Sequence, residues 1–335
     1  MLRQDPTPTA RGPQIPANPL GRFCAIYESL NENRSWWEGR TMFRFCALAL
    51  TTLPGEPREL AARLDRITED LRTSTPWYKR SSVGTMLAAL LLRHDDGAKG
   101  SIAELERAGP LFREHWRFSG SSHEALAIQV LRQHSPDRRV SEAQVARLAE
   151  IWKEMKKHHP VLTQKTDWPI CALLATTSAT PVQIAVRLEA VYQDLRERGF
   201  HAGDQLQTAA QVLFFHHELP GVVAARFQEL YEQFKSSGLW MGSADYDEIA
   251  LLCFAPQPAS EILSTVQGHR EKIRALKPAP DKQTSFTLAC GTALLELARG
   301  SKDTVLLSEA QLLIAIQAIL AAQQAAVIAS TAAAS

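Results

Sequence analysis

Four segments of the chain share one spacing of hydrophobic and polar positions. Each places an arginine second and then apolar residues three or four positions apart, which is the spacing of one helix face. The segments are ARLDRITEDLRTSTP from Ala62, ARLAEIWKEMKKHHP from Ala146, VRLEAVYQDLRERGF from Val186 and ARFQELYEQFKSSGL from Ala225. The arginines (Arg63, Arg147, Arg187 and Arg226) stand 84, 40 and 39 residues apart. The first step is two periods, because a weaker copy, SIAELERAGPLFREHW, lies between. The pattern predicts a helix about every 40 residues, with a kink or restart at Gly109-Pro110 in the weaker copy.

A second apolar run accompanies each of these helices. The runs are FRFCALALTTL, VGTMLAALLL, HEALAIQVL, PICALLATT, TAAQVLFF and EIALLCF, with FTLACGTALLELA after the last helix. Strand signals are weak throughout. A helix pair that repeats at this interval is typical of an α-solenoid or of its closed relative, the α/α toroid, in which stacked neighbours share a continuous core. We predict an all-α fold, an α-solenoid of about six to seven helix pairs, with a closed α/α toroid as the alternative.

The two ends of the chain depart from this repeat. Residues 1–20 contain five prolines and no apolar core of a signal peptide, which predicts a mobile proline-rich arm. After Glu309 the chain carries no charge, but four glutamines interrupt its apolar residues. That pattern favours a packed helix over a membrane span. We therefore expect a helical-repeat domain over residues 21–300 and a terminal capping helix with an alanine-rich tail over residues 301–335.

Composition narrows the class of protein. With 45% hydrophobic and 22% charged residues, the 335-residue chain is typical of a globular protein. Lys+Arg 37 against Asp+Glu 36 provides no net charge that would attract nucleic acid or an anionic membrane. The five cysteines are far apart and lie mostly in apolar runs, which indicates buried reduced thiols and a cytoplasmic protein.

The stretch MKKHHPVLTQKTDW, from Met155 to Trp168, reads as a helix end, a loop and a helix start. His159 occupies the repeat position that Gly199 and Gly238 fill, where a left-handed residue ends the helix. Histidine tolerates that conformation better than most residues. Asp167 then precedes Trp168-Pro169 and is expected to cap the next helix.

This stretch also carries a family resemblance. EMKKHHPVLTQKTDWPICALLA, the helix ends DLRERGF and FKSSGLW, and the tail QQAAVIASTAAA resemble the bacterial domain-of-unknown-function 4003 family. The resemblance runs from about Arg40 to the C-terminus. It implies a soluble, cytoplasmic, all-helical protein, and it carries no activity, cofactor or catalytic residue that could be transferred.

Chemistry-bearing side chains collect in the loops that follow the four aligned helices. Equivalent loops of stacked repeats meet along one edge, so we expect these side chains to share an edge rich in aromatic and histidine residues. The candidate catalytic residues are His123, His159, Asp167 and Asp204, with proton transfer assigned to the histidines and charge stabilisation to the aspartates. The candidate ligand-binding residues are Trp77, Trp116, Trp168, His201, Trp240 and Tyr246.

The sequence predicts no metal site and identifies no cofactor. There is no CxxC pair, and HEALA at His123 lacks the second histidine of HExxH. Neither a glycine-rich phosphate loop nor GxSxG occurs. Metal binding by several of the edge histidines together with an aspartate is the alternative.

The aligned arginines have two interpretations. Each arginine directly precedes a residue of the core face, which predicts that the arginines lie along the helix surface and pair with nearby Glu or Asp. The alternative is a ladder that lines a concave groove and binds acidic peptide or phosphate. Aromatic residues occupy another equivalent position of the repeat, at Trp152, Tyr192 and Tyr231. We expect them to pack between repeats.

Two functional hypotheses follow. The first is a helical-repeat binding protein that holds a peptide, a protein or a small ligand on the aromatic and histidine-rich edge or in the groove. The alternative is an enzyme that acts on a small hydrophobic or cationic substrate in a cavity enclosed by the helix pairs, with His and Asp at its rim. Nucleic acid and a membrane span are expected for neither, and fold alone does not decide between them.

Overall fold

A computed structural model describes residues 14–32, 40–74, 83–93, 97–116, 121–300 and 316–321. Within these residues the secondary structure is helical, without a strand, so the predicted all-α class is confirmed. The predicted arm over residues 1–20 lies largely outside the described residues, and the first helix begins at Pro19. None of the described helices combines the length and the apolar character that crossing a lipid bilayer requires.

The helices alternate between an outer and an inner layer, and each outer helix is followed by its inner partner. The outer helices are α1 (Pro19–Asn31), α3 (Pro57–Ser74), α5 (Ala98–His115), α7 (Glu142–His158), α9 (Pro181–Glu197), α11 (Pro220–Ser236) and α13 (Ala259–Arg274). The inner helices are α2 (Arg40–Leu50), α4 (Val83–Arg93), α6 (Ser122–Gln133), α8 (Trp168–Leu174), α10 (Asp204–Leu213), α12 (Tyr246–Leu252) and α14 (Lys282–Gly300). Two short 3₁₀ turns, η2 (Lys165–Asp167) and η3 (Ser243–Asp245), lead into α8 and α12.

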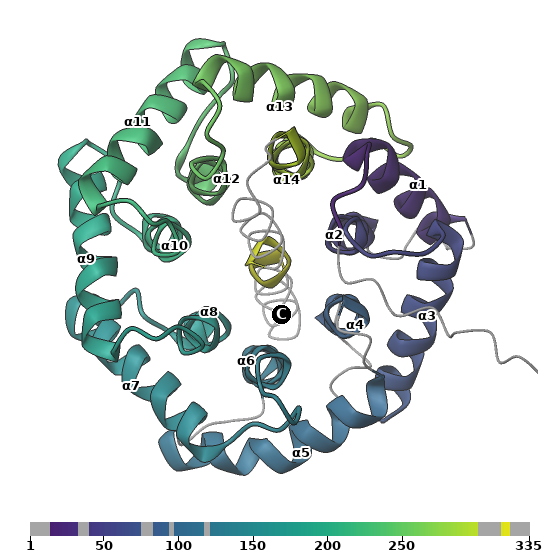
Figure 1. The fold of residues 1–335 in the computed structure, drawn as a ribbon, viewed down its shortest axis with the longest axis vertical. Coiled ribbons are helices and arrows are strands. Elements are labelled where there is room, and N and C mark those ends of the chain that lie inside the picture. The colour runs from purple at the N-terminus through teal and green to yellow at the C-terminus, as the bar shows by residue number, and fades with distance from the viewer. Residues whose placement is uncertain are drawn as a thin grey trace, which may run out of the picture.

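The helix pairs close into a ring. Successive outer helices pack side by side from α1 to α13, and the last inner helix, α14, contacts both α1 and α2. Figure 1 shows the inner helices standing around a central space with the outer helices wrapped around them. The arrangement is therefore the closed toroid that the sequence left as an alternative, and an open superhelix does not describe these residues.

The centre of the ring is occupied by the chain itself. Residues 316–321 form a helical segment in the central space, drawn in yellow in Figure 1, and each of them is buried. Gln317 donates from Nε2 to the carbonyl oxygen of Thr287 on α14, at 2.9 Å. Inner helices such as α8 are buried on every face, a pattern that suits a helix surrounded by protein.

The repeated arginines have a role that neither sequence interpretation anticipated. The Arg187 side chain of α9 donates to the carbonyl oxygens of Phe214, His216 and Glu218, just beyond the end of α10. Arg147 binds three carbonyls after α8 in the same way, and Arg226 binds two after α12. The last carbonyls of a helix lack partners within it and carry its negative dipole end. Arg147, Arg187 and Arg226 thus join their outer helices to the ends of the inner partners, and Arg226 also pairs with an acid, Glu229, at 2.7 Å.

Three local predictions need correction. Gly199 and Gly238 have positive φ angles of 90° and 83°, but the φ of His159 is −129°, so His159 is not left-handed. Asp167 does not cap α8; its Oδ2 accepts instead from the backbone N–H of Gln164, at 2.8 Å. The helix α5 runs without interruption through Gly109 and Pro110.

The cysteine prediction agrees with the structure. All five thiols are free, and four of them are buried. Cys24 on α1 is partly exposed. Burial raises the pKa of Cys171, Cys253 and Cys290, so these thiols stay protonated and pack as apolar side chains.

Candidate functional site

A small pocket lies where α7, α9 and α10 meet, and we call it the α7–α9–α10 pocket. It is lined by Met155, His158, His159, Ala185, Leu188, Glu189, Tyr192, Gln207, Ala210 and Gln211. Its free space is about 20 Å³, enough for one water molecule or a group of similar size. The histidines come from the end of α7, Glu189 and Tyr192 from α9, and the glutamines from the inner helix α10.

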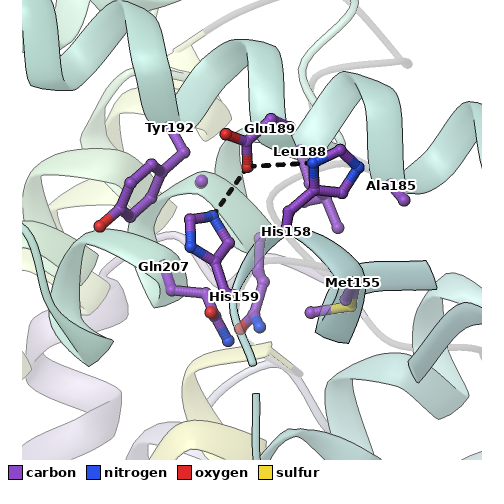
Figure 2. Close-up of a pocket in the computed structure, with 10 residues that line it drawn as sticks. Met155, His158, His159, Ala185, Leu188, Glu189, Tyr192 and Gln207 are labelled. Atoms are coloured by element: carbon purple, nitrogen blue, oxygen red, sulfur yellow. Dashed lines mark ion pairs between the residues drawn. The ribbon is translucent and has the colours of Figure 1, made fainter. Parts of the chain in front are cut away.

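Two imidazoles face one carboxylate at the mouth of this pocket. His159 Nε2 lies 2.8 Å from Glu189 Oε2, and His158 Nδ1 lies 3.9 Å from the same oxygen. Figure 2 shows both rings turned toward Glu189. The His158 side chain is 38% exposed and the Glu189 side chain 21%, so the mouth reaches solvent.

The carboxylate of Glu189 is held in place but not saturated. Its Oε1 accepts from Gln193 Nε2 at 2.6 Å. Its Oε2 pairs with His159 Nε2 at 2.8 Å, and a carboxylate oxygen with one such partner has a second lone pair. The oxygen that faces the pocket therefore keeps acceptor capacity.

The walls of the pocket combine aromatic and apolar surface. The rings of His159 and Tyr192 lie 4.3 Å apart between centroids, at an interplanar angle of 57°. Met155, Ala185 and Leu188 supply apolar surface from α7 and α9. An aromatic face beside a carboxylate is an arrangement that attracts cations.

Asp167 lies behind the pocket and orients its inner wall. Its Oδ1 accepts from Gln207 Nε2 at 3.1 Å and from Gln211 Nε2 at 2.8 Å. Because a carboxylate only accepts hydrogen bonds, both amide nitrogens must face Asp167 and the amide oxygens must face away. Gln207 Oε1 is buried and has no hydrogen-bond partner in the described part of the chain. Burial raises the pKa of Asp167, while the hydrogen bonds from Gln211, Gln164 and Gln207 oppose the rise.

The structure brings two of the predicted residues, His159 and Asp167, to the pocket and places others in the core. Trp116 and Trp168 lie 4.5 Å apart between ring centroids, and Trp168 is fully buried. Tyr246 is 1% exposed and packs edge to face against Phe200. In this conformation these three rings form packing contacts and not a surface open to a ligand.

The remaining predicted residues do not line the pocket. Asp204 and His201 are exposed at the start of α10, and Trp240 is 86% exposed in the loop before η3. His123 is half-buried on α6, and its pKa is lowered by burial and by the charge of Lys165. Trp77 lies outside the described residues.

Three polar pocket residues escaped the sequence analysis: Glu189, Gln207 and Gln211. Glu189 lies three residues before Tyr192, and the equivalent positions of the neighbouring repeats hold Ala149 and Gln228. An acidic residue at this position, following a repeat that ends in two histidines, is the signal that could have identified the site. Tyr192 was predicted to pack between repeats, and it does pack, but it also forms a pocket wall.

Metal ligation is not supported by the geometry. No group of three or more His, Cys, Asp or Glu side chains in the described ranges is placed to hold a metal ion.

A second polar cluster joins α12 to α14 beside the central segment. Glu248 is 2% exposed, and its Oε1 accepts a short hydrogen bond from Thr287 Oγ1. The backbone carbonyl of Thr287 is the group that holds Gln317. Burial raises the pKa of Glu248 well above the ordinary glutamate value, and the adjacent Asp247 carboxyl raises it further.

This shift predicts a pH-dependent stability. A carboxyl with a higher pKa in the folded than in the unfolded state stabilises the fold fully below its unfolded pKa, about 4.3. That stabilisation is lost as pH rises through the folded pKa of Glu248. Glu248→Gln, which keeps the acceptor and removes the charge, is expected to melt at a higher temperature than wild type at pH 8. The gain should shrink toward pH 4.

The matched control for this prediction is Glu271→Gln, on the exposed face of α13. Melting temperatures of both variants are measured by circular dichroism across the pH range. A gain for Glu248→Gln that is the same at pH 4 and pH 8, or a loss at pH 8, would contradict the assignment.

Comparisons with known proteins follow the fold. A family model described as "Protein of unknown function (DUF4003)" matches residues 26–325. A curated relative, "Uncharacterized protein YeaA" from Bacillus subtilis (strain 168), is 28% identical over 188 residues. The match covers 55% of this chain and 55% of the relative, so the chain spans about half the length of that relative. No solved structure matches the chain significantly.

Proposed function

We propose that this chain, which belongs to the DUF4003 family, is a binding protein whose ligand site is the α7–α9–α10 pocket. One observation carries the proposal. Gln207 Oε1 is buried in the pocket wall without a hydrogen-bond partner in the described structure, and the Glu189 carboxylate, whose Oε2 pairs with His159 Nε2 at 2.8 Å, lies at a mouth that reaches solvent. Buried polar groups in folded proteins are normally satisfied, so an unsatisfied one in the wall of a pocket indicates a missing partner.

The ligand in this proposal is a peptide, a protein or a small molecule that inserts one group into the pocket. The pocket's size supports this, because a space of about 20 Å³ takes a single functional group and not a whole organic substrate. The rest of such a ligand would lie on the loops that follow the outer helices, where Val161 and Trp240 are exposed.

The enzyme hypothesis has less support. It requires a substrate cavity enclosed by the helix pairs, and residues 316–321 lie in the centre of the ring where that substrate would sit. Of the two predicted catalytic residues near the pocket, His159 lines it and Asp167 does not. Asp167 acts there through the glutamines and does not line the space itself.

The test is a screen of small fragments of all charge types by saturation-transfer NMR. Ala185→Val adds two carbons to a residue that lines the pocket, and it is expected to abolish the binding of fragments that occupy it. Ala225→Val, the same change on the exposed face of α11, is the matched control and should leave binding intact. Hits that survive Ala185→Val, or the absence of hits with wild type, would refute the proposed function.

A further inference from the structure

We infer that the group taken by the α7–α9–α10 pocket is a primary ammonium, from a lysine side chain of a peptide or from a free alkylamine. The inference rests on the proposed function and names the chemistry of its ligand. It depends on which hydrogen-bonding capacity the pocket leaves open.

The hydrogen-bonding groups that the pocket leaves available to a ligand are acceptors. Gln207 is 5% exposed, and its Nε2 donates to Asp167 Oδ1, while its Oε1 has no partner in the described structure. Glu189 Oε2 pairs with His159 Nε2 at 2.8 Å and keeps a second lone pair, and the bond from Gln193 to Oε1 fixes the direction of the carboxylate. A ligand group that fits must therefore bring several N–H or O–H donors.

Charge and aromatic surface favour a cation among such donors. Glu189 carries a negative charge, and a charged donor makes a hydrogen bond about twice as strong as a neutral one. The Tyr192 ring next to it offers a π face at the side of the pocket, and cations bind such faces. An anion would meet the Glu189 carboxylate, and the amide nitrogens of Gln207 and Gln211 are directed at Asp167.

Size restricts the cation to a small one with three donors. The space of about 20 Å³ matches a group the size of a water molecule, which suits –NH₃⁺ better than the larger, planar guanidinium. An alkyl chain attached to it would follow the apolar side chains of Met155 and Leu188 and leave past the half-exposed His158.

The experiment is a calorimetric titration with n-butylammonium chloride, n-butanol and sodium butyrate. Wild type is expected to bind n-butylammonium and neither of the other two. Glu189→Gln should weaken n-butylammonium binding by about tenfold or more, because it removes a charge-assisted hydrogen bond. Glu197→Gln, on the same helix at an exposed position, should bind like wild type.

A second variant guards against a folding defect in the first. Tyr192→Leu retains bulk but removes the aromatic face, and it is expected to weaken n-butylammonium binding by about threefold or more. Equal affinity of n-butylammonium for wild type and Glu189→Gln, or butanol binding as tightly as the amine, would overturn the inference.

Two further comparisons distinguish a peptide from a free amine as the source of the ammonium group, and a failure of the ammonium inference from a failure of the proposed function. The peptide used is acetylated at its N-terminus, so that its lysine side chain carries its only ammonium group. Tighter binding of this peptide than of n-butylammonium assigns the ammonium to a peptide, and equal or weaker binding assigns it to a free amine. If neutral or anionic fragments bind and are lost with Ala185→Val while amines fail, the ammonium inference falls and the proposed function stands. If no fragment binds wild type, both fall.

Discussion

Replacing Arg187 with methionine is expected to lower the free energy of unfolding by about 2–4 kcal/mol. The guanidinium donates to three backbone carbonyls just beyond α10, including 2.5 Å to His216 O and 2.8 Å to Glu218 O. Methionine keeps the length and the apolar stem but leaves these carbonyls without their charged donor. Urea unfolding followed by circular dichroism measures the loss.

Two controls separate this role from a general effect of charge. Arg274→Met, at an exposed position at the end of α13, should change the free energy of unfolding by less than about 0.5 kcal/mol. Arg187→Lys should restore little of the loss, because one ammonium cannot reproduce the fork that spans three carbonyls. A loss for Arg187→Met no larger than that for Arg274→Met would show that the carbonyl contacts contribute nothing to stability.

Replacing Gly291 with alanine is expected to destabilise the protein by about 1–2 kcal/mol through the segment in the centre of the ring. A Cβ at Gly291 would lie 2.3 Å from Gln317 Oε1 and 2.7 Å from Leu48 Cδ2. Gln317 would have to swing away and give up its hydrogen bond to Thr287 O. Helix propensity alone predicts the opposite sign, since alanine in a helix is favoured over glycine by about 1 kcal/mol.

The double variant Gly291→Ala/Gln317→Ala tests whether the clash is the cause. Gln317→Ala removes the atoms nearest the new methyl group, so the two changes together should cost less than the sum of each alone. Hydrogen exchange of residues 316–321 should rise in Gly291→Ala and rise no further in the double variant. A stabilised Gly291→Ala protein with unchanged exchange would mean that the central segment does not pack against α14 as described.

The repeat and the helix class could be predicted from the sequence because they depend on local spacing. Capping residues such as Ser141 and Thr180 start their outer helices through boxes with Gln144 and Gln183, as their local sequence suggests. Ring closure could not be predicted, because it depends on a small rotation per repeat that brings α14 against α1. No short stretch of sequence encodes that accumulated angle.

The candidate site was predictable only in part for a similar reason. His159 and Asp167 were found because they lie in one conspicuous loop segment. Glu189 was missed because it reaches the pocket from the next outer helix, 30 residues beyond His159. The carbonyl contacts of Arg147, Arg187 and Arg226 were missed because these partners lie 27 to 32 residues further along the chain, which side-chain patterns do not reveal.

The most direct test of the ammonium pocket uses methionine methyl groups as reporters. The chain has five methionines, and Met155 lines the pocket, whereas Met42 and Met86 are buried on α2 and α4. Protein labelled with [¹³C-methyl]methionine is titrated with n-butylammonium chloride. We expect the Met155 signal to shift in wild type and to stay fixed in Glu189→Gln, with Met42 and Met86 unchanged in both. A Met155 signal that does not move in wild type, or that moves equally in Glu189→Gln, would contradict the claim that this pocket binds an ammonium group.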